Sequence, residues 1–170
     1  MNNICKKVKK RDNPNDVFLT PETLVKIHLE LVKPFYKTND KILDGFYGKG
    51  IYYNMFPSYF KDCDRDFTEI EMGKDFFEYY DKIDMIISNP PYSIIDNVLE
   101  KSVMLKPHTI SYLIGAMNLT TRRIEYMENN GYKLVKFHLT KVYKWFGMSC
   151  IVVFSKEGNS CLSYDRIVHK

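Results

Sequence analysis

Apolar residues recur along the chain with two periods, and each period predicts a kind of element. Between residues 24 and 31 they return every three or four positions, which predicts an amphipathic helix. We expect that helix to open with Thr20 as N-cap and Pro21 at its first position, and to close at Pro34. The near-continuous apolar run at 83–88 instead predicts a strand buried on both faces, as in a parallel sheet.

Shorter patterns complete an alternation of strands and helices. Further strands are expected at 41–44, at a weak segment ending near 68–70, at 109–114, 134–139 and 150–155, with helices at about 50–56 before Pro57, 93–105 and 121–130, the last followed by Gly131 as C′ residue. Alternating strands and helices predict an α/β domain with a mainly parallel sheet. Ligands of such sheets bind beyond the carboxyl ends of the strands, so the loops after Asp44, Ile70 and Ser88 should share one crevice.

Length and composition limit the class of protein. The 170 residues, 45% of them hydrophobic and 27% charged, suit one soluble globular domain, expected at 13–170 behind a basic tail at 1–12. No apolar run is long enough to span a membrane, and no secretory signal is recognised at the N-terminus. The scattered cysteines (Cys5, Cys63, Cys150, Cys161) and histidines predict reduced thiols in a cytoplasmic or nuclear-type compartment and no metal site.

The net charge of +4 conceals an uneven distribution. Residues 1–11 carry five bases and no acid, residues 12–100 nine bases and 17 acids, and residues 101–170 11 bases and four acids. An acidic middle between basic ends is typical of a protein with one surface for a polyanion. A solvated tail and ordinary surface lysines explain the charge equally well.

Two segments carry candidate chemistry. The first, DGFYGKG at 44–50, follows a strand, and its glycines let the backbone turn tightly and approach a ligand. Its spacing fits neither the dinucleotide fingerprint nor a P-loop, so alone it is only a glycine-rich turn. The second is Asn89-Pro90-Pro91-Tyr92, a stiff extended strut at a strand end. The Asn89 amide oxygen and Pro90 carbonyl can accept hydrogen bonds from one amino group, and Tyr92 offers a flat ring for a planar substrate.

Together these segments resemble the S-adenosylmethionine-dependent amino-methyltransferases of the N6-adenine class. Asn89–Tyr92 matches the catalytic [DNS]-P-P-[YFW] of that class, and the segment 44–50 resembles its cofactor loop D-P-F-x-G-x-G, with Gly45 in place of proline and Lys49 between the glycines. The segment 16–21 resembles its aromatic-x-T-P segment, and 69–77 its ribose-binding acid followed by D-F-F. The resemblance spans roughly 16–155 and implies a Rossmann-like class I methyltransferase, with an antiparallel last strand and helices on both faces of the sheet.

The resemblance also implies roles for individual residues. The catalytic set is Asn89, Pro90, Pro91 and Tyr92; the cofactor set is Phe18, Thr20, Pro21, Asp44, Gly45, Phe46, Gly48, Gly50, Glu69, Ile70, Asp75, Phe76 and Asn89; the substrate set is Tyr92, Lys141, Lys144, Trp145 and Phe146. Glu69 would bind the cofactor ribose, although Asp64, Asp66 and Glu71 compete for that role. The basic, aromatic loop 141–148 suits a nucleic acid strand, with Lys for phosphates and Trp or Phe for stacking, or else packs Trp145 in the core.

The expected function is methyl transfer from S-adenosylmethionine to N6 of adenine in DNA. The same chemistry on RNA, glutamine N5 methylation of a protein, and a non-catalytic methyltransferase-like subunit remain alternatives. No target-recognition domain is recognised, so a partner subunit could supply it. Nucleic acid is the expected partner, with DNA favoured over RNA, and no membrane. Frequent Lys, Asn, Ile and Tyr are typical of an A/T-rich genome such as that of a virus.

Overall fold

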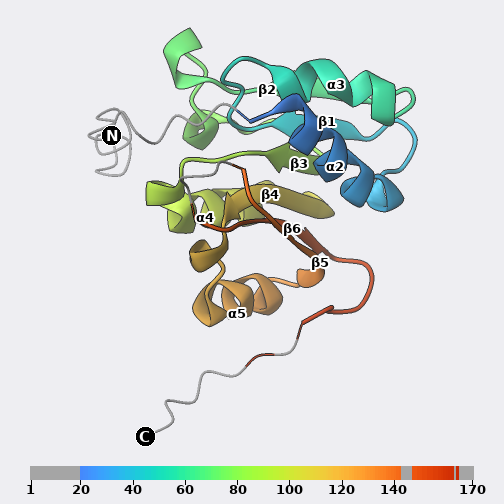
Figure 1. Ribbon diagram of the computed structural model, residues 1–170. Helices are drawn as coiled ribbons and strands as arrows, with labels where there is room; N and C mark the ends of the chain where they lie inside the picture. The colour runs from blue at the N-terminus through green and yellow to red at the C-terminus, as the bar shows by residue number, and fades with distance from the viewer. Residues whose placement is uncertain (1–19, 143–146, 163, 165–170) are drawn as a thin grey trace, which may run out of the picture.

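A single mixed sheet organises the chain in the computed structural model, which describes residues 20–142, 147–162 and 164 (Figure 1). Its strands are β1 (Lys41–Asp44), β2 (Asp64–Phe67), β3 (Met85–Ser88), β4 (Thr109–Gly115), β5 (Lys133–Thr140) and β6 (Ser149–Ser155). The order is β2-β1-β3-β4-β6-β5; β1 to β4 pair in parallel, whereas β6 is antiparallel to both β4 and β5. The predicted α/β class, with its mainly parallel sheet and antiparallel last strand, is confirmed.

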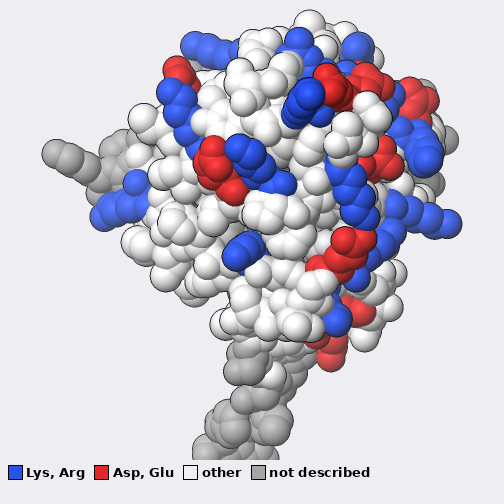
Figure 2. Space-filling view, turned by 90° about the vertical axis from the view of Figure 1, so that its right-hand side faces the viewer, with Lys and Arg blue, Asp and Glu red and all other residues white. Residues whose placement is uncertain are grey.

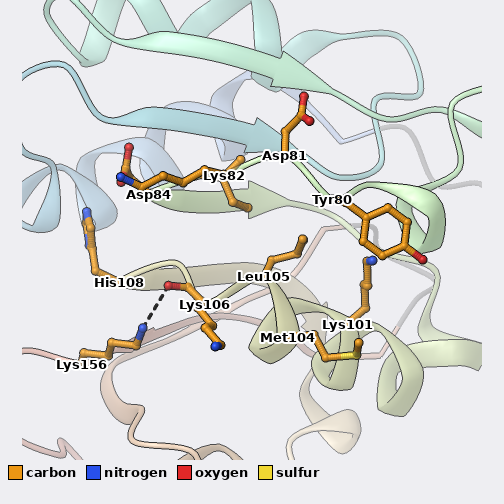
Figure 3. A pocket seen from close by; sticks show the side chains of 11 residues that line it. Tyr80, Asp81, Lys82, Asp84, Lys101, Met104, Leu105, Lys106, His108 and Lys156 are labelled. Carbon is orange, nitrogen blue, oxygen red and sulfur yellow. Dashed lines mark hydrogen bonds between the residues drawn. The ribbon is translucent and has the colours of Figure 1, made fainter.

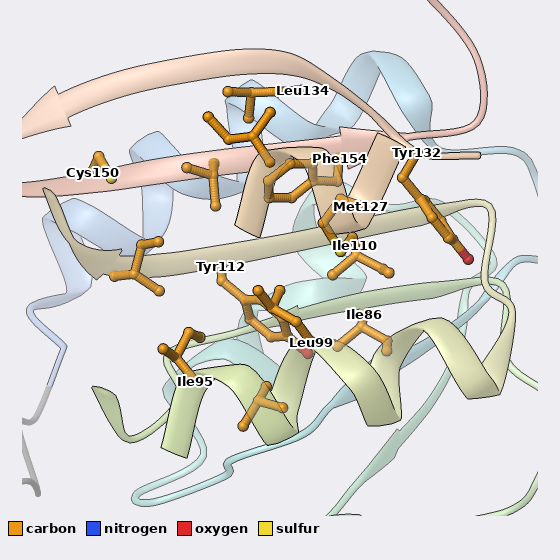
Figure 4. Close-up of a cluster of buried hydrophobic side chains, with 14 of the residues drawn as sticks. Ile86, Ile95, Leu99, Ile110, Tyr112, Met127, Tyr132, Leu134, Cys150 and Phe154 are labelled. Carbon is orange, nitrogen blue, oxygen red and sulfur yellow. The ribbon is translucent and has the colours of Figure 1, made fainter. Parts of the chain in front are cut away.

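Helices cover both faces of this sheet. Helices α2 (Glu22–Val32) and α3 (Ile51–Tyr59) pack on one face, whereas α4 (Ile95–Leu105) and α5 (Thr121–Asn129) pack on the other. Consecutive residues of β3 serve opposite faces, because Ile86 joins the α4–α5 cluster and Ile87 the α2–α3 cluster. Both are fully buried, as the apolar run at 83–88 predicts. Figure 4 shows the α4–α5 cluster, in which the Tyr112 hydroxyl lies 2.7 Å from Ser102 Oγ.

Two predicted boundaries of the first helices are wrong. Helix α2 begins at Glu22 with Pro21 as its N-cap residue, so Thr20 is not the cap; Thr20 Oγ1 instead accepts a hydrogen bond from Asn89 Nδ2 at 3.1 Å. Helix α3 continues through Pro57 to Tyr59. A proline inside a helix leaves the carbonyl four residues earlier without its usual donor. Here that carbonyl, on Tyr53, accepts from Arg65 Nη1 at 2.6 Å.

Short 3₁₀ turns replace the ends of other predicted elements. Strand β2 ends at Phe67, before the predicted 68–70, and Glu69 forms only an isolated bridge to Lys74. The turns are η2 (Lys33–Phe35), η3 (Ile70–Met72), η4 (Phe76–Glu78), η5 (Tyr92–Ile94) and η6 (Ala116–Asn118). Three of them, η3, η5 and η6, come soon after the carboxyl ends of β2, β3 and β4, which is the edge where the candidate motifs lie.

A buried histidine joins α2, α3 and β4. His28 is fully buried, with Nδ1 2.8 Å from the Tyr52 hydroxyl and Nε2 2.7 Å from Ser111 Oγ. Ser111 Oγ donates its only hydrogen to the Val152 carbonyl at 2.9 Å, so His28 Nε2 must donate to Ser111. Burial lowers the pKa of His28 from 6.5 to about 3, so the ring is neutral at neutral pH and its Nδ1 accepts from the Tyr52 hydroxyl.

This depressed pKa makes the fold sensitive to acid. Unfolded His28 binds a proton below about pH 6.5 and folded His28 only near pH 3, so its stabilising contribution is complete above pH 6.5 and is lost as the pH falls. The free energy of unfolding can be compared between the wild type and His28→Gln. The difference, wild type minus variant, should fall by about 2 kcal/mol when the pH is lowered from about 8 to 5. Urea denaturation at each pH measures it. The raised pKa of Asp44 has the opposite effect on stability as the pH falls. Asp44 is present in both proteins, so its effect cancels in the difference. If the free energies of unfolding of the two proteins changed in parallel with pH, His28 would not have the lowered pKa.

Candidate active site

Three loops meet at the carboxyl edge of the parallel strands. Ser88 Oγ, at the end of β3, donates to Asp44 Oδ1 at 2.6 Å and accepts from Phe46 N at 3.0 Å. Gly48 N, in the loop after β1, donates to Glu69 Oε2 at 2.8 Å. The loops predicted to share one crevice therefore lie in direct hydrogen-bonded contact. Ser88 was not among the predicted site residues, although its place directly before Asn89 and its strand's pairing with β1 could have indicated it.

The segment 44–50 forms a left-handed turn that ends at helix α3. Gly48 has φ 54° and Gly50 has φ 74°, values that side chains disfavour, and Gly50 is the N-cap residue of α3. The Tyr47 ring covers Gly50 so closely that a Cβ there would lie 2.3 Å from Tyr47 Cζ. These two glycines are therefore required by the shape of the loop itself.

The position of the competing acids favours Glu69 as the one that faces the loop. Glu69 is 9% exposed and accepts from Gly48 N, whereas Asp64 and Glu71 are exposed. Asp66 Oδ2 is engaged elsewhere, because it accepts from the Tyr79 hydroxyl at 3.0 Å and lies 3.6 Å from Lys41 Nζ.

Asp75 and Phe76 lie beside the same loop. Asp75 Oδ1 accepts from Phe77 N at 2.9 Å, while its Oδ2 is buried without a hydrogen-bond partner among the described residues. The Phe76 ring centroid is 4.9 Å from that of Phe46, and a Cβ at Gly45 would lie 3.0 Å from the Phe76 ring. A larger residue at position 45 would push against that ring, which accounts for glycine there. Ile70 opens η3, directly after Glu69.

A second carboxyl group, Asp44, is fully buried at this edge. Its Oδ1 accepts from Ser88, and its Oδ2 has no partner among the described residues. Burial raises the pKa of Asp44 to about 6, a change opposed by the hydrogen bond from Ser88. Asp44 and Asp75 thus each have one buried carboxylate oxygen without a hydrogen-bond partner among the described residues, and such oxygens suit a ligand with cationic and amino groups.

The Asn89–Tyr92 segment leaves the end of β3 and leads into η5. Pro90 is buried, Pro91 is extended with φ −61° and ψ 126°, and Tyr92 is half-buried. The hydrogen bond from Asn89 Nδ2 to Thr20 Oγ1 ties this segment to the residue before α2. Thr20, predicted for the cofactor side, therefore also orients the amide of Asn89, a contact that no sequence pattern indicated.

The loop after β5 approaches the same edge. The backbone N of Ala116, which follows β4, donates to the Met148 carbonyl at 2.8 Å. Lys141 is exposed. The predicted residues Phe18, Lys144, Trp145 and Phe146 lie outside the described residues, so their placement stays a prediction.

A cavity of about 460 Å³ lies at the opposite, amino-terminal ends of β3 and β4 and contains none of the predicted residues (Figure 3). Two of its lysines have internal contacts: Lys101 Nζ lies 4.0 Å from the centre of the Tyr80 ring, and Lys156 Nζ donates to the Lys106 carbonyl at 3.0 Å. Figure 2 views the side on which β6 ends and shows basic and acidic side chains interspersed there.

Within the described part of the chain, no three His, Cys, Asp or Glu residues are grouped to hold a metal, and no helix has the length and apolar character of a membrane span.

No protein-family profile and no curated protein sequence matches the chain. Several solved protein structures, in contrast, match the chain. A methyltransferase from Pyrococcus furiosus has 18% identity and a TM-score of 0.60, over 82% of this chain and 84% of that one. A chain of the E. cuniculi Mtq2–Trm112 complex, responsible for methylation of the eRF1 translation termination factor, has 13% identity and a TM-score of 0.60, over 84% and 99%. A Burkholderia thailandensis 1,6-didemethyltoxoflavin-N1-methyltransferase with bound S-adenosylhomocysteine has 9% identity and a TM-score of 0.61, over 81% and 80%.

At these identities the similarity establishes the fold, which is a Rossmann-like fold that this chain shares with these methyltransferases. This agrees with the fold that the sequence motifs imply.

Proposed function

We propose that this chain is a methyltransferase that transfers a methyl group from S-adenosylmethionine to the exocyclic N6 of adenine in DNA. One observation carries the proposal: in a methyltransferase fold, Asn89-Pro90-Pro91-Tyr92 follows the end of β3. It begins directly after Ser88, which is hydrogen-bonded to the loop after β1, and the same loop is hydrogen-bonded to Glu69. The alternatives are adenine in RNA and the side-chain amide of a protein, since each also presents an –NH₂ group.

On the cofactor side, bound S-adenosylmethionine supplies a methyl group that is already activated for transfer. Glu69 would accept hydrogen bonds from the ribose hydroxyls and Asp75 Oδ2 from the adenine amino group. Asp44 would lie toward the cationic methionine end, with Gly48 and Gly50 allowing close backbone approach. Both partnerless carboxylate oxygens would then gain partners, which is why the residues present fit this cofactor.

On the acceptor side, Asn89 Oδ1 and the Pro90 carbonyl would each accept a hydrogen bond from the amino group of the substrate. That nitrogen is a poor nucleophile because its lone pair is delocalised into the ring. Fixed acceptors favour a more tetrahedral nitrogen and stabilise the positive charge that develops as it attacks. Tyr92 would stack on the base, which in a duplex must first be flipped out of the helix.

The raised pKa of Asp44 predicts a pH-dependent affinity for the cofactor product. Protonation below about pH 6 removes the charge that attracts the methionine ammonium, so S-adenosylhomocysteine should bind about tenfold more weakly at pH 5 than at pH 7.5. Calorimetric titration at both values measures this. Asp44→Asn should bind weakly at both and lose the dependence. If the variant kept the wild-type pH profile, another group would be responsible.

The choice of a nucleic acid over a protein substrate rests on charge and on the loop 141–148. Basic residues concentrate at 1–11 and 101–170, and they alternate with aromatic residues in that loop, as suits a strand of phosphates and bases. Target recognition by a partner subunit is part of the proposal, and the Mtq2–Trm112 complex is a solved example of a methyltransferase-fold chain with a partner.

Transfer of labelled methyl groups to separate pools of DNA, RNA and protein, followed by nucleoside and amino-acid analysis, tests the function. We expect label in N6-methyladenine from DNA. Label in RNA adenine or in glutamine would move the function to that alternative, and no label in any pool under conditions where the cofactor binds would favour a non-catalytic subunit.

A further inference from the structure

The segment that follows β4 brings an amide group next to Tyr92. Strand β4 ends at Gly115, and η6 continues to Asn118. A Cβ at Gly115 would lie 3.0 Å from Asn118 Nδ2 and 3.5 Å from Cδ2 and Cε2 of Tyr92. The amide and the ring therefore meet over the same backbone position, where a larger residue would press on the Asn118 amide.

The orientation of the Asn118 amide is determined by Arg123. Arg123 Nη1 donates to the Asn118 carbonyl at 2.6 Å and to Asn118 Oδ1 at 3.3 Å. A guanidinium group has no acceptor, so the oxygen of the amide must face Arg123 and the –NH₂ must face Gly115 and Tyr92. Asn118 Nδ2 makes no hydrogen bond to any other residue that the structure describes.

Arg123 is itself bound by an acid near the catalytic segment. Its Nε lies 2.7 Å from Asp96 Oδ1 and its Nη2 3.2 Å from Asp96 Oδ2, and its side chain is only 16% exposed. The hydrogen bond from Arg123 lowers the pKa of Asp96, so the pair stays charged at neutral pH. Asp96 lies in the first turn of α4, four residues after Tyr92. One network thus joins the starts of α4 and α5 to η6.

We propose that Asn118 Nδ2 donates a hydrogen bond to the ring nitrogen beside the methylated amino group, with Arg123 as the positioning residue. This inference rests on the proposed function, because it requires a heterocyclic amine stacked on Tyr92. In adenine, N6 is flanked by N1 on the Watson–Crick edge and by N7 on the major-groove edge, and both are acceptors. A donor beside the stacking ring recognises either nitrogen, and it selects a base whose amino group has such a neighbour.

Analogues that lack one ring nitrogen test the subsite. The probes are three pools of single-stranded random-sequence DNA that contain adenine, 1-deazaadenine or 7-deazaadenine, each assayed for methyl transfer with the intact chain. The wild type should lose roughly 3- to 10-fold in kcat/KM on one analogue, the effect of one neutral hydrogen bond. Loss on the 1-deaza pool assigns the contact to N1, and loss on the 7-deaza pool assigns it to N7.

The variants separate recognition from folding. Asn118→Asp keeps the shape and the contact with Arg123 but replaces the donor with an acceptor, so the ratio between adenine and the analogue should approach one. Arg123→Ala should shrink the same ratio, whereas Arg122→Ala, which removes a 66% exposed arginine that also pairs with Asp96, should leave it unchanged. A ratio is independent of the fraction of folded protein.

Two results would overturn the inference. If wild type and Asn118→Asp discriminate equally against each analogue, or if the wild type does not discriminate at all, Asn118 is not the donor, while methylation of the adenine pool keeps the proposed function intact. If the adenine pool itself is not methylated, the proposed function on DNA fails, and the subsite for its base fails with it.

Discussion

Replacing Asn89 with alanine should lower the rate of methyl transfer by roughly 10²–10³-fold, about 3–4 kcal/mol, because one preorganised acceptor for the reacting amino group is lost. Affinity for S-adenosylhomocysteine should fall far less than the rate, since Asn89 Oδ1 would face the acceptor amino group, although the resemblance also places Asn89 in the cofactor set. Single-turnover assays and calorimetry on the same preparation separate the two quantities.

Matched variants sharpen that prediction. Asn89→Asp should retain part of the activity, because a carboxylate oxygen also accepts a hydrogen bond from the amino group. Tyr92→Ala should cost about 1–3 kcal/mol through lost stacking, and Tyr92→Phe much less, because the ring matters more than the hydroxyl. Full activity of Asn89→Ala on every acceptor would reduce the Asn-Pro-Pro-Tyr segment to a turn and remove the basis for amino-group methylation.

The second large effect is expected at Glu69. Glu69→Ala should weaken binding of S-adenosylhomocysteine by about 1.5–3 kcal/mol, the contribution of hydrogen bonds to a charged group. Part of the loss will come from the loop itself, because Glu69 also accepts the hydrogen bond from Gly48 N at 2.8 Å. Calorimetry measures the change in affinity.

Asp66→Asn is the matched control for Glu69, because Asp66 lies in the preceding strand and is engaged with Tyr79 and Lys41. It should bind the cofactor product normally. Normal binding by Glu69→Ala together with failure of Asp66→Asn would mean that the ribose lies along β2 instead of beyond its carboxyl end.

Strongly periodic or uniformly apolar segments made most of the fold predictable from the sequence. The near-continuous apolar run at 83–88 predicts a strand buried on both faces, and β3, which begins at Met85, has this character. The errors arose where a tertiary contact overrode a local rule. Pro57 remains inside α3, where Arg65, from β2, satisfies the carbonyl of Tyr53. Thr20 lies one residue before the N-cap Pro21, and its hydroxyl accepts from Asn89. Neither partner is visible in local sequence.

The candidate site was predictable as far as its motifs extend. Asn89–Tyr92 and the segment 44–50 carry their own spacing, and they meet because parallel strands end at one edge. The choice among the acids in and after β2 depended on where that strand ends, which a weak apolar pattern does not define. Asn118 and Arg123 belong to no motif; their orientation follows only from the packing of α5 against α4.

Binding of the cofactor product by the intact chain tests the central claim most directly. Calorimetric titration with S-adenosylhomocysteine at neutral pH should show saturable binding of one molecule per chain, weakened by Glu69→Ala and unaffected by Asp66→Asn. Absence of binding by the wild type at concentrations up to about 1 mM, equivalent to less than about 4 kcal/mol of binding free energy, would contradict the account of this edge of the sheet as a cofactor site.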